Sequence, residues 1–417
     1  MDAFDILAIL MTLVATFAVI NHWFIRLPTT IGLMLISMLC SMVILLANNM
    51  GYDENLFFWA TNILNKIDFN KVLMDGMLSA LLFAGALHIN LRDLLEQRAV
   101  VTLLATLGVV ISTFFVGYSS HYALSHLGIE IPLMYCLLFG ALISPTDPIA
   151  VLSIMKRVGT AKSLETKVSC ESLFNDGVGV VVFLVILGIA TGEQAPTFSH
   201  ISEMLLLEAG GGILLGLVIG WIGFEVLRRI DNYSVEILVT LALVLGGYSL
   251  ALALHTSGPI AIVVTGLLIG NHGRQYAMSE TTRRHIDTFW ELVDEILVAS
   301  LFVLIGLEIL VVNIQGAYLY AGLLAVPVVL LSRALAVGVT MSLLKMGGRK
   351  FSKGAFTVLT WGGLRGGLSV AMALSLPPSQ EREVILTMTY VVVAFSILVQ
   401  GVTIGRMIPK ADKPTKA

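Results

Sequence analysis

Apolar stretches of membrane-spanning length recur along almost the whole chain, and this repetition restricts the fold more than any other feature. The 417 residues are 57% hydrophobic and 13% charged, and one helical crossing of a bilayer needs about 20 apolar residues. This composition excludes a soluble globule, and nothing in it indicates nucleic-acid binding. We therefore predict an all-α polytopic membrane protein.

Thirteen transmembrane helices can be placed on the sequence. The ninth is short and begins at Gly258-Pro259. The stretch from Phe57 to Ile67 is interpreted as an interfacial helix, because Lys66 and Asp68 interrupt it. The predicted spans lie near 4–24, 29–47, 72–89, 99–121, 132–155, 166–191, 203–227, 234–255, 259–271, 288–312, 316–344, 355–376 and 384–408.

The basic residues are divided unevenly between the two sides of the predicted membrane. Loops that follow odd-numbered spans, together with the C-terminal tail, hold 20 of the 25 Lys and Arg, and the opposite loops hold only Lys66, Lys71 and Arg382. Cytoplasmic loops of membrane proteins are enriched in Lys and Arg. The N-terminus is therefore predicted to lie outside and the C-terminus in the cytoplasm.

Two predicted spans, the fifth and the twelfth, contain residues that disfavour helix. Two prolines in Ser144-Pro145-Thr146-Asp147-Pro148 remove backbone donors, and glycines flank Leu364-Arg365 on both sides. Freed carbonyls near Thr146, and its hydroxyl, can coordinate a cation. Asp147 either offsets the positive end of the following half-helix or pairs with Arg365. Because the two segments are seven spans apart, we predict two inverted six-helix repeats with a binding site at the interruptions.

The sixth span carries two acids at membrane depth, where ionised groups are costly and usually functional. In Glu171-Ser172-Leu173-Phe174-Asn175-Asp176, Ser172 and Asp176 are four residues apart, as are Glu171 and Asn175, so they share one helix surface. Arg333 lies inside another apolar run and needs an acid, for which Glu171 is the best candidate. Asp176 then remains uncompensated and can bind either a cation or a proton, which predicts one charge per cycle.

Other polar and small residues receive a less specific interpretation. Glu291, Asp294 and Glu295 begin the tenth span and are predicted to form a solvated entrance, while Glu308 near its outer end is predicted to be structural. Gly210, Gly211, Gly212, Gly216 and Gly220 favour close helix packing, for which a dimer interface is one candidate.

Five motifs occur in order along the chain: Ser144 to Pro148, Glu171 to Asp176, Phe289-Trp290-Glu291, Leu301 to Leu307 and Gly362 to Gly366. Together they resemble those of the sodium/proton antiporters of the NhaP/NHE type, in the cation/proton antiporter superfamily. The resemblance implies a homodimer and an elevator-like movement, with residues 99–192 and 314–408 as the ion-transport core. Residues 1–98 and 193–313 would form the connector and dimerisation scaffold, and 409–417 a short cytoplasmic tail. The Asn175-Asp176 pair implies electroneutral one-for-one exchange.

The resulting hypothesis is a prokaryotic inner-membrane antiporter that exchanges Na⁺ or Li⁺ for H⁺ and needs no cofactor. Na⁺ would bind Asp176, Thr146 and Ser172, with Asn175 and Asp147 completing or orienting the site, and Glu171, Arg333 and Arg365 compensating charge. K⁺/H⁺ exchange is the nearest alternative, since cavity size and ligand number set selectivity. A cation channel is a further alternative. An enzyme is not expected, because no His-Glu-x-x-His or activated-nucleophile motif accompanies the carboxylates.

Overall fold

The computed structural model describes residues 3–51, 54–160, 162–192, 203–312, 316–349, 351 and 354–408, and the predicted tail 409–417 lies outside them. Within those ranges the regular structure is helical, apart from one isolated antiparallel bridge between Asp147 and Leu364. The prediction of an all-α membrane protein with two broken helices is confirmed.

The described residues contain nine helices that are long and apolar enough to cross a membrane, and each coincides with a predicted span. Four predicted spans are not among these nine. The spans near 132–155 and 355–376 are broken helices, the span near 259–271 is a short helix, and the span near 288–312 belongs to a helix with a charged first half. The count of thirteen crossings stays a prediction. The nine are Phe4–Ile25, Thr29–Asn49, Phe69–Leu87, Leu91–His126, Lys162–Ala190, Glu203–Leu227, Tyr233–Ala253, Gly316–Met346 and Gln380–Met407.

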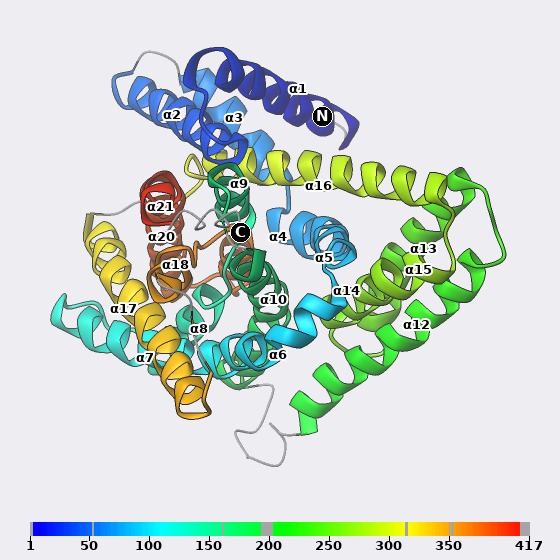
Figure 1. The fold of residues 1–417 in the computed structure, drawn as a ribbon. Helices are drawn as coiled ribbons and strands as arrows, with labels where there is room; N and C mark the ends of the chain where they lie inside the picture. The colour runs from blue at the N-terminus through cyan, green and yellow to red at the C-terminus, as the bar shows by residue number, and fades with distance from the viewer. Residues whose placement is uncertain are drawn as a thin grey trace.

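One bundle surrounds the two broken spans (Figure 1). Its interior is the larger hydrophobic cluster, which includes Phe139 and Phe183. The predicted boundary between residues 98 and 99 falls inside one of its helices. The members are α6 (Leu91–Ala105), α7 (Leu107–His126), α8 (Leu133–Ile143), α9 (Ile149–Val158), α10 (Lys162–Ala190), α17 (Gly316–Met346), α18 (Ala355–Trp361), α19 (Gly367–Leu374), α20 (Gln380–Phe395), the π-helical turn η5 (Ser396–Gln400) and α21 (Gly401–Met407).

The remaining helices flank this bundle, and the long helix α16 (Glu280–Glu308) lies along α2 and α5. Phe83 of α5 packs on Trp290 of α16 with ring centroids 4.7 Å apart. The other members are α1 (Ala3–Ile20), η1 (Asn21–Ile25), α2 (Thr29–Asn49), α3 (Glu54–Lys66), α4 (Phe69–Lys71), η2 (Val72–Met77), α5 (Leu78–Leu87), η3 (Leu206–Gly210), α12 (Gly211–Leu227), α13 (Tyr233–Ala253), α14 (Gly258–Leu268), η4 (Ile269–Gly273) and α15 (Arg274–Tyr276).

The glycine-rich face of α12 packs against α14 within the same chain. A Cβ added at Gly216 would lie 2.8 Å from the Cβ of Val264 and closer still to the carbonyl oxygen of Ala261. The Thr265 hydroxyl donates to the Gly216 carbonyl over 3.1 Å. The prediction of close packing is confirmed, but the packing partner is α14, so the stripe gives no support to a dimer contact.

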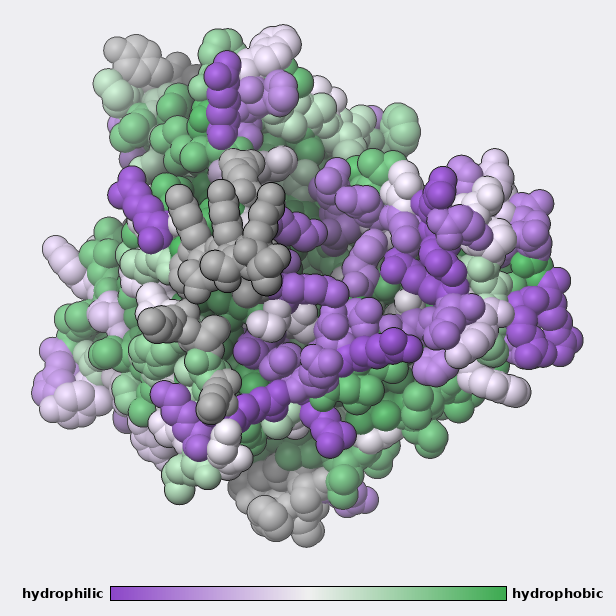
Figure 2. All heavy atoms as spheres, in the orientation of Figure 1, coloured by the Kyte–Doolittle hydropathy of each residue, from purple (hydrophilic) through white to green (hydrophobic). Residues whose placement is uncertain are grey.

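Polar side chains collect on one face of the molecule. Figure 2 shows them over α15, the beginning of α16 and the beginning of α6, with hydrophobic side chains around the rim. Local caps fix these helix starts: Asn90 accepts from the backbone N–H of Arg92 over 2.9 Å before α6, and Ser279 precedes α16 and accepts from the N–H of Thr282 over 3.3 Å. Capping side chains satisfy helix N–H groups that have no partner inside the helix.

Candidate functional site

The two helix interruptions meet inside the first bundle. The Asp147 N–H donates to the Leu364 carbonyl over 2.8 Å, so extended backbone from one break pairs with extended backbone from the other. A Cβ at Gly366 would lie 2.7 Å from the Cβ of Asp147 and closer to its carboxylate. Only glycine fits at this approach, which agrees with the glycine-rich sequence of the twelfth span.

Arg365 satisfies the carbonyls freed in the fifth span. Its Nη1 donates to the carbonyls of Ser144 and Pro145, the latter over 2.9 Å. The predicted pairing of Arg365 with Asp147 is therefore not the contact found. Instead the Asp147 carboxylate accepts from the Ile149 N–H over 2.9 Å at the first turn of α9, which is the other alternative, an acid at the positive end of a half-helix.

Thr146, between these carbonyls and Asp147, is fixed to α10 by three hydrogen bonds. The Asn175 amide donates to the Thr146 hydroxyl over 2.9 Å, and its Oδ1 accepts from the Thr146 N–H over 3.2 Å. The Ser172 hydroxyl donates to the Thr146 carbonyl. Both ends of the Asn175 amide are thus occupied, so Asn175 positions the break, whereas the oxygens of Ser172 and Thr146 keep lone pairs that can bind a cation.

Glu171 and Arg333 form the predicted ion pair. The Arg333 Nη1 donates to Glu171, and its Nε donates to the Leu359 carbonyl over 3.0 Å. Their side chains are only 2% and 7% exposed, respectively. A buried charge requires this kind of compensation, and the pairing removes Glu171 from the groups free to bind an ion.

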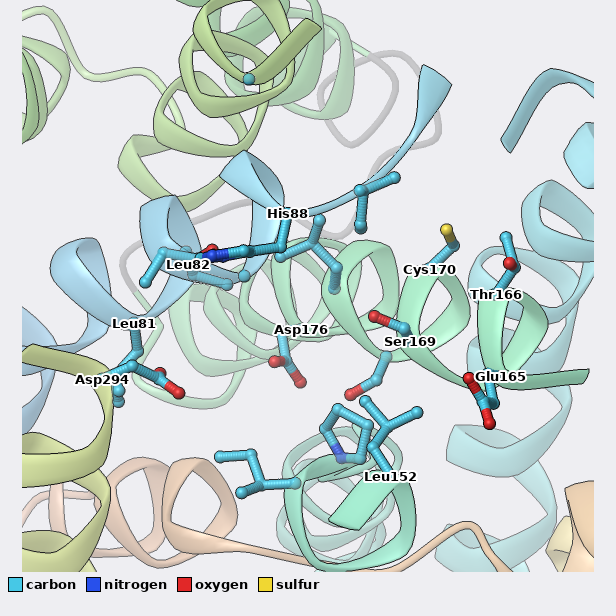
Figure 3. Close-up of a pocket in the computed structure, with 18 of the residues that line it drawn as sticks. Leu81, Leu82, His88, Leu152, Glu165, Thr166, Ser169, Cys170, Asp176 and Asp294 are labelled. Carbon is cyan, nitrogen blue, oxygen red and sulfur yellow. The ribbon is translucent and has the colours of Figure 1, made fainter. Parts of the chain in front are cut away.

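Asp176 lies at the inner end of a cavity of about 1390 Å³, which Thr146, Asp147 and Ser172 also line. Figure 3 shows its carboxylate pointing into the open space between α10 and the neighbouring helices. Asp147 is close enough for the two carboxylates to repel one another. A cation placed between these carboxylates would relieve that repulsion, and protonation of either would do the same.

The cavity widens toward residues that sequence reasoning placed in cytoplasmic loops. Basic side chains at its mouth come from three of these loops, and Glu291, Asp294 and Glu295 line the wall formed by α16, as predicted for a solvated entrance. The basic lining residues are Arg92, Lys156, Lys162, Arg274 and Arg283.

Ser169 and His88 are among the lining residues that were not predicted from the sequence. Ser169 points into the cavity from the same helix as Asp176 (Figure 3). It precedes Ser172 by three residues and Asp176 by seven, which is the spacing of one helix face and could have identified it. The His88 Nδ1 bonds the Ala84 carbonyl over 2.8 Å. His88 reaches the cavity because α5 ends there, which no local pattern indicates.

An apolar helical body with two crossed helix breaks and a cavity that acidic and basic side chains line defines a multi-pass membrane transporter of the discontinuous-helix class. The model of the family described as "Sodium/hydrogen exchanger, transmembrane" matches residues 9–410. The chain belongs to this sodium/hydrogen exchanger family.

Two relatives agree with that assignment, and a solved structure shares the fold. The chain is 49% identical over 407 residues to the Na⁺/H⁺ antiporter NhaP of Pseudomonas aeruginosa, covering 97% of this chain and 96% of the relative. It is 37% identical to the Na⁺/H⁺ antiporter NhaH of Halobacillus aidingensis, covering 82% and 83%. The structure of the sodium proton antiporter MjNhaP1 from Methanocaldococcus jannaschii has the same fold, with a TM-score of 0.69 at 21% identity, covering 91% of this chain and 97% of that one.

Proposed function

We propose that the protein exchanges Na⁺ for H⁺ across the membrane and that both ions bind at Asp176 in turn. The observation that carries this proposal is the position of Asp176, an acid that lines the cavity of about 1390 Å³ and has no ion pair with a basic side chain among the residues that the structure describes. Carboxylate and hydroxyl oxygens are the ligands that hard cations prefer. Asp176, Thr146 and Ser172 supply them, with Asp147 contributing negative charge.

Competition for one carboxylate couples the two ions. A cation at Asp176 excludes the proton, and a proton neutralises the charge that attracts the cation. Glu171 is already compensated by Arg333, and the Arg365 guanidinium is held on backbone carbonyls. One charge therefore crosses in each direction per cycle, which makes the exchange electroneutral at one to one.

The basic residues at the cavity mouth support an inward-facing arrangement, because Lys and Arg are enriched in cytoplasmic loops. The N-terminus is then outside and the C-terminus inside, in the inner or plasma membrane of a prokaryote. Family membership supports a homodimer in which the bundle containing α10 and the broken helices moves against the helices around α12 to α16.

Transport measurements distinguish exchange of Na⁺ from exchange of Li⁺ or K⁺, and exchange from conduction through a channel. Li⁺ is expected to replace Na⁺ at the same oxygens, whereas K⁺ exchange would indicate a larger site. A channel would carry a voltage-dependent cation current. Electroneutral exchange instead proceeds at the same rate when a membrane potential is imposed.

The test uses purified protein in proteoliposomes with a pH-sensitive dye and pulses of Na⁺, Li⁺ or K⁺. Asp176→Asn should reduce exchange to the level of empty liposomes, because an amide cannot release a proton. The matched control is Glu130→Gln, at an exposed acid in the connection between α7 and α8, which should leave the rate unchanged. Exchange retained by Asp176→Asn would remove Asp176 from its proposed role.

A further inference from the structure

Helix α16 has two different surroundings along its length. Glu291, Asp294 and Glu295 in its first half line the cavity, and Leu301 is its last lining residue. From Phe302 to Leu307 every side chain is buried, against α2 and against apolar residues of the bundle that contains the broken helices. The second half of α16 therefore forms the seal on the side opposite the cavity mouth.

One acid, Glu308, lies at the end of this sealed half. Glu308 is 8% exposed. It follows Asp294 by 14 positions, which is about 21 Å along a helix that rises about 1.5 Å per residue. Burying an acid is costly unless it is compensated. The acids Glu291, Asp294 and Glu295 in the first half of α16 line the cavity. Glu308 differs from them because it is buried.

The compensating group is Arg382, at the beginning of α20 in the other bundle, and Tyr390 lies about two turns further along the same helix. The Arg382 guanidinium attracts the Glu308 carboxylate electrostatically while donating to the Leu374 carbonyl at the end of α19 over 3.2 Å. The Tyr390 hydroxyl, also within electrostatic range of Glu308, is buried and has no hydrogen-bond partner among the residues that the structure describes. A buried carboxylate on α16 and a buried, unpartnered hydroxyl on α20 thus lie within electrostatic range of each other.

We propose that Glu308 is the cation-recruiting carboxylate of the second vestibule, the counterpart of Asp294 on the opposite side of the membrane. This inference rests on the proposed exchange function, because alternating access requires the second half of α16 to separate from α19 and α20. Separation takes Arg382 away from Glu308 and hydrates the Tyr390 hydroxyl. The carboxylate and hydroxyl then offer a hard monovalent cation its first ligands on that side, which replaces the structural role expected for Glu308 from the sequence.

Sided transport measurements test this assignment. Glu308→Gln is expressed in a host without sodium/proton exchangers, and the apparent Na⁺ affinity is measured in right-side-out and in everted membrane vesicles. In right-side-out vesicles added Na⁺ meets the side that carries Glu308, and the half-saturating Na⁺ concentration should rise by roughly threefold to tenfold, the effect of one charge in a focusing vestibule. In everted vesicles it should stay within about twofold.

Matched variants separate recruitment from folding. Glu383→Gln, at an exposed acid in the same first turn of α20, should change neither vesicle type, and Asp294→Asn should show the mirrored pattern. If Glu308→Gln does not reach the membrane, Arg382→Gln provides the second test, because loss of the compensating charge should lower the half-saturating concentration in right-side-out vesicles.

Two results would overturn the inference. One is a half-saturating Na⁺ concentration that Glu308→Gln leaves unchanged or raises equally in both vesicle types. The other is a rise, in place of the expected fall, of that concentration for Arg382→Gln in right-side-out vesicles. Absence of Na⁺-driven proton movement by the unmodified protein in both vesicle types is a different result, since it would overturn the proposed function and the inference with it.

Discussion

Each charged residue near the crossing of the broken helices has a distinct set of partners. Glu171 is neutralised by Arg333, Arg365 is held on carbonyls, and Asp147 accepts a backbone N–H at the start of α9. Among the residues that the structure describes, Asp176 has none of these arrangements, and it lines the cavity. This separation of compensated from uncompensated charge supports the proposal that a single acid alternates between two ions.

The Glu171–Arg333 pair should be more important for folding than for chemistry. Removing one partner of a buried ion pair costs about 3–5 kcal/mol, whereas replacing both is often near neutral. We expect Glu171→Gln and Arg333→Gln each to lower the apparent melting temperature of the purified protein by roughly 5 °C or more. The double substitution should recover much of that loss. Thermal unfolding followed by size-exclusion fluorescence measures all three.

The control for the buried pair is an exposed one. Arg229 pairs with Glu225 over 2.6 Å, but its side chain is 72% exposed, and exposed pairs contribute about 0–1 kcal/mol. Arg229→Gln should therefore leave the melting temperature nearly unchanged. Equal destabilisation by Arg229→Gln and Arg333→Gln would contradict a special role for the buried pair.

Sequence reasoning succeeded where a residue conflicts with its surroundings. Asp176, Glu171 and Arg333 stand out because charge is costly in an apolar helix, and the pairing of the last two followed from the need for compensation. The bonds of Asn175 to Thr146 and of Arg365 to Ser144 and Pro145 could not be foreseen in the same way. They depend on how two separate breaks approach each other, which neither segment specifies alone.

At the scale of elements, the site depends on two backbone segments passing closely without side chains between them. A methyl group at Gly366 would overlap Asp147. Gly366→Ala should therefore separate the breaks and reduce exchange at least tenfold, even where the protein still folds. The proteoliposome assay measures the rate, with protein amount normalised by quantitative blotting.

Gly246→Ala provides the matched substitution. Gly246 lies in α13, where an added Cβ meets nothing within 4 Å, and alanine in a helix interior is favoured over glycine by about 0.5–1 kcal/mol. This variant should exchange normally and be as stable as the unmodified protein or more so. Equal activity of Gly366→Ala and Gly246→Ala would show that the close crossing is not required.

The glycine stripe of α12 shows why an element's partner is harder to predict than its surface. Small residues at three- and four-residue spacing correctly indicated close packing, but the same pattern suits a contact within one chain or between two. The choice of α14 follows from the short connections that bring α12, α13 and α14 together. Periodicity along one helix contains no information about those connections.

At the scale of the whole molecule, the cavity mouth defines which side of the membrane the site faces. Ser169 should be reachable only from the side of the cavity mouth, which we assign to the cytoplasm. In a variant whose Cys40, Cys136 and Cys170 are replaced, Ser169→Cys should react with a membrane-impermeant thiol reagent in everted vesicles and not in right-side-out vesicles. Mass spectrometry of the labelled protein measures the difference.

A cysteine on the opposite side controls that experiment. Glu383 is exposed at the beginning of α20, so Glu383→Cys should be labelled in right-side-out vesicles only. Labelling of Ser169→Cys from the Glu383 side would reverse the proposed orientation.

Ion binding and global stability should be linked through Asp176. A ligand that binds only the folded protein stabilises it by RT ln(1 + [L]/Kd), about 2.7 kcal/mol at 100 times Kd. Na⁺ should therefore raise the melting temperature in a saturable manner, and Asp176→Asn should abolish the increase. Choline at equal ionic strength controls for general salt effects.

The pH dependence of this stabilisation has a defined sign. Protons occupy the carboxylate that Na⁺ needs, so lowering the pH through the titration of Asp176 weakens Na⁺ binding, by about tenfold in apparent Kd per unit once the acid is mostly protonated. Na⁺ stabilisation should thus be full at high pH and lost at low pH, and excess Na⁺ should restore it. Stabilisation that is equal at every pH at subsaturating Na⁺ would mean that the cation and the proton occupy separate sites, and exchange through one carboxylate would then be excluded.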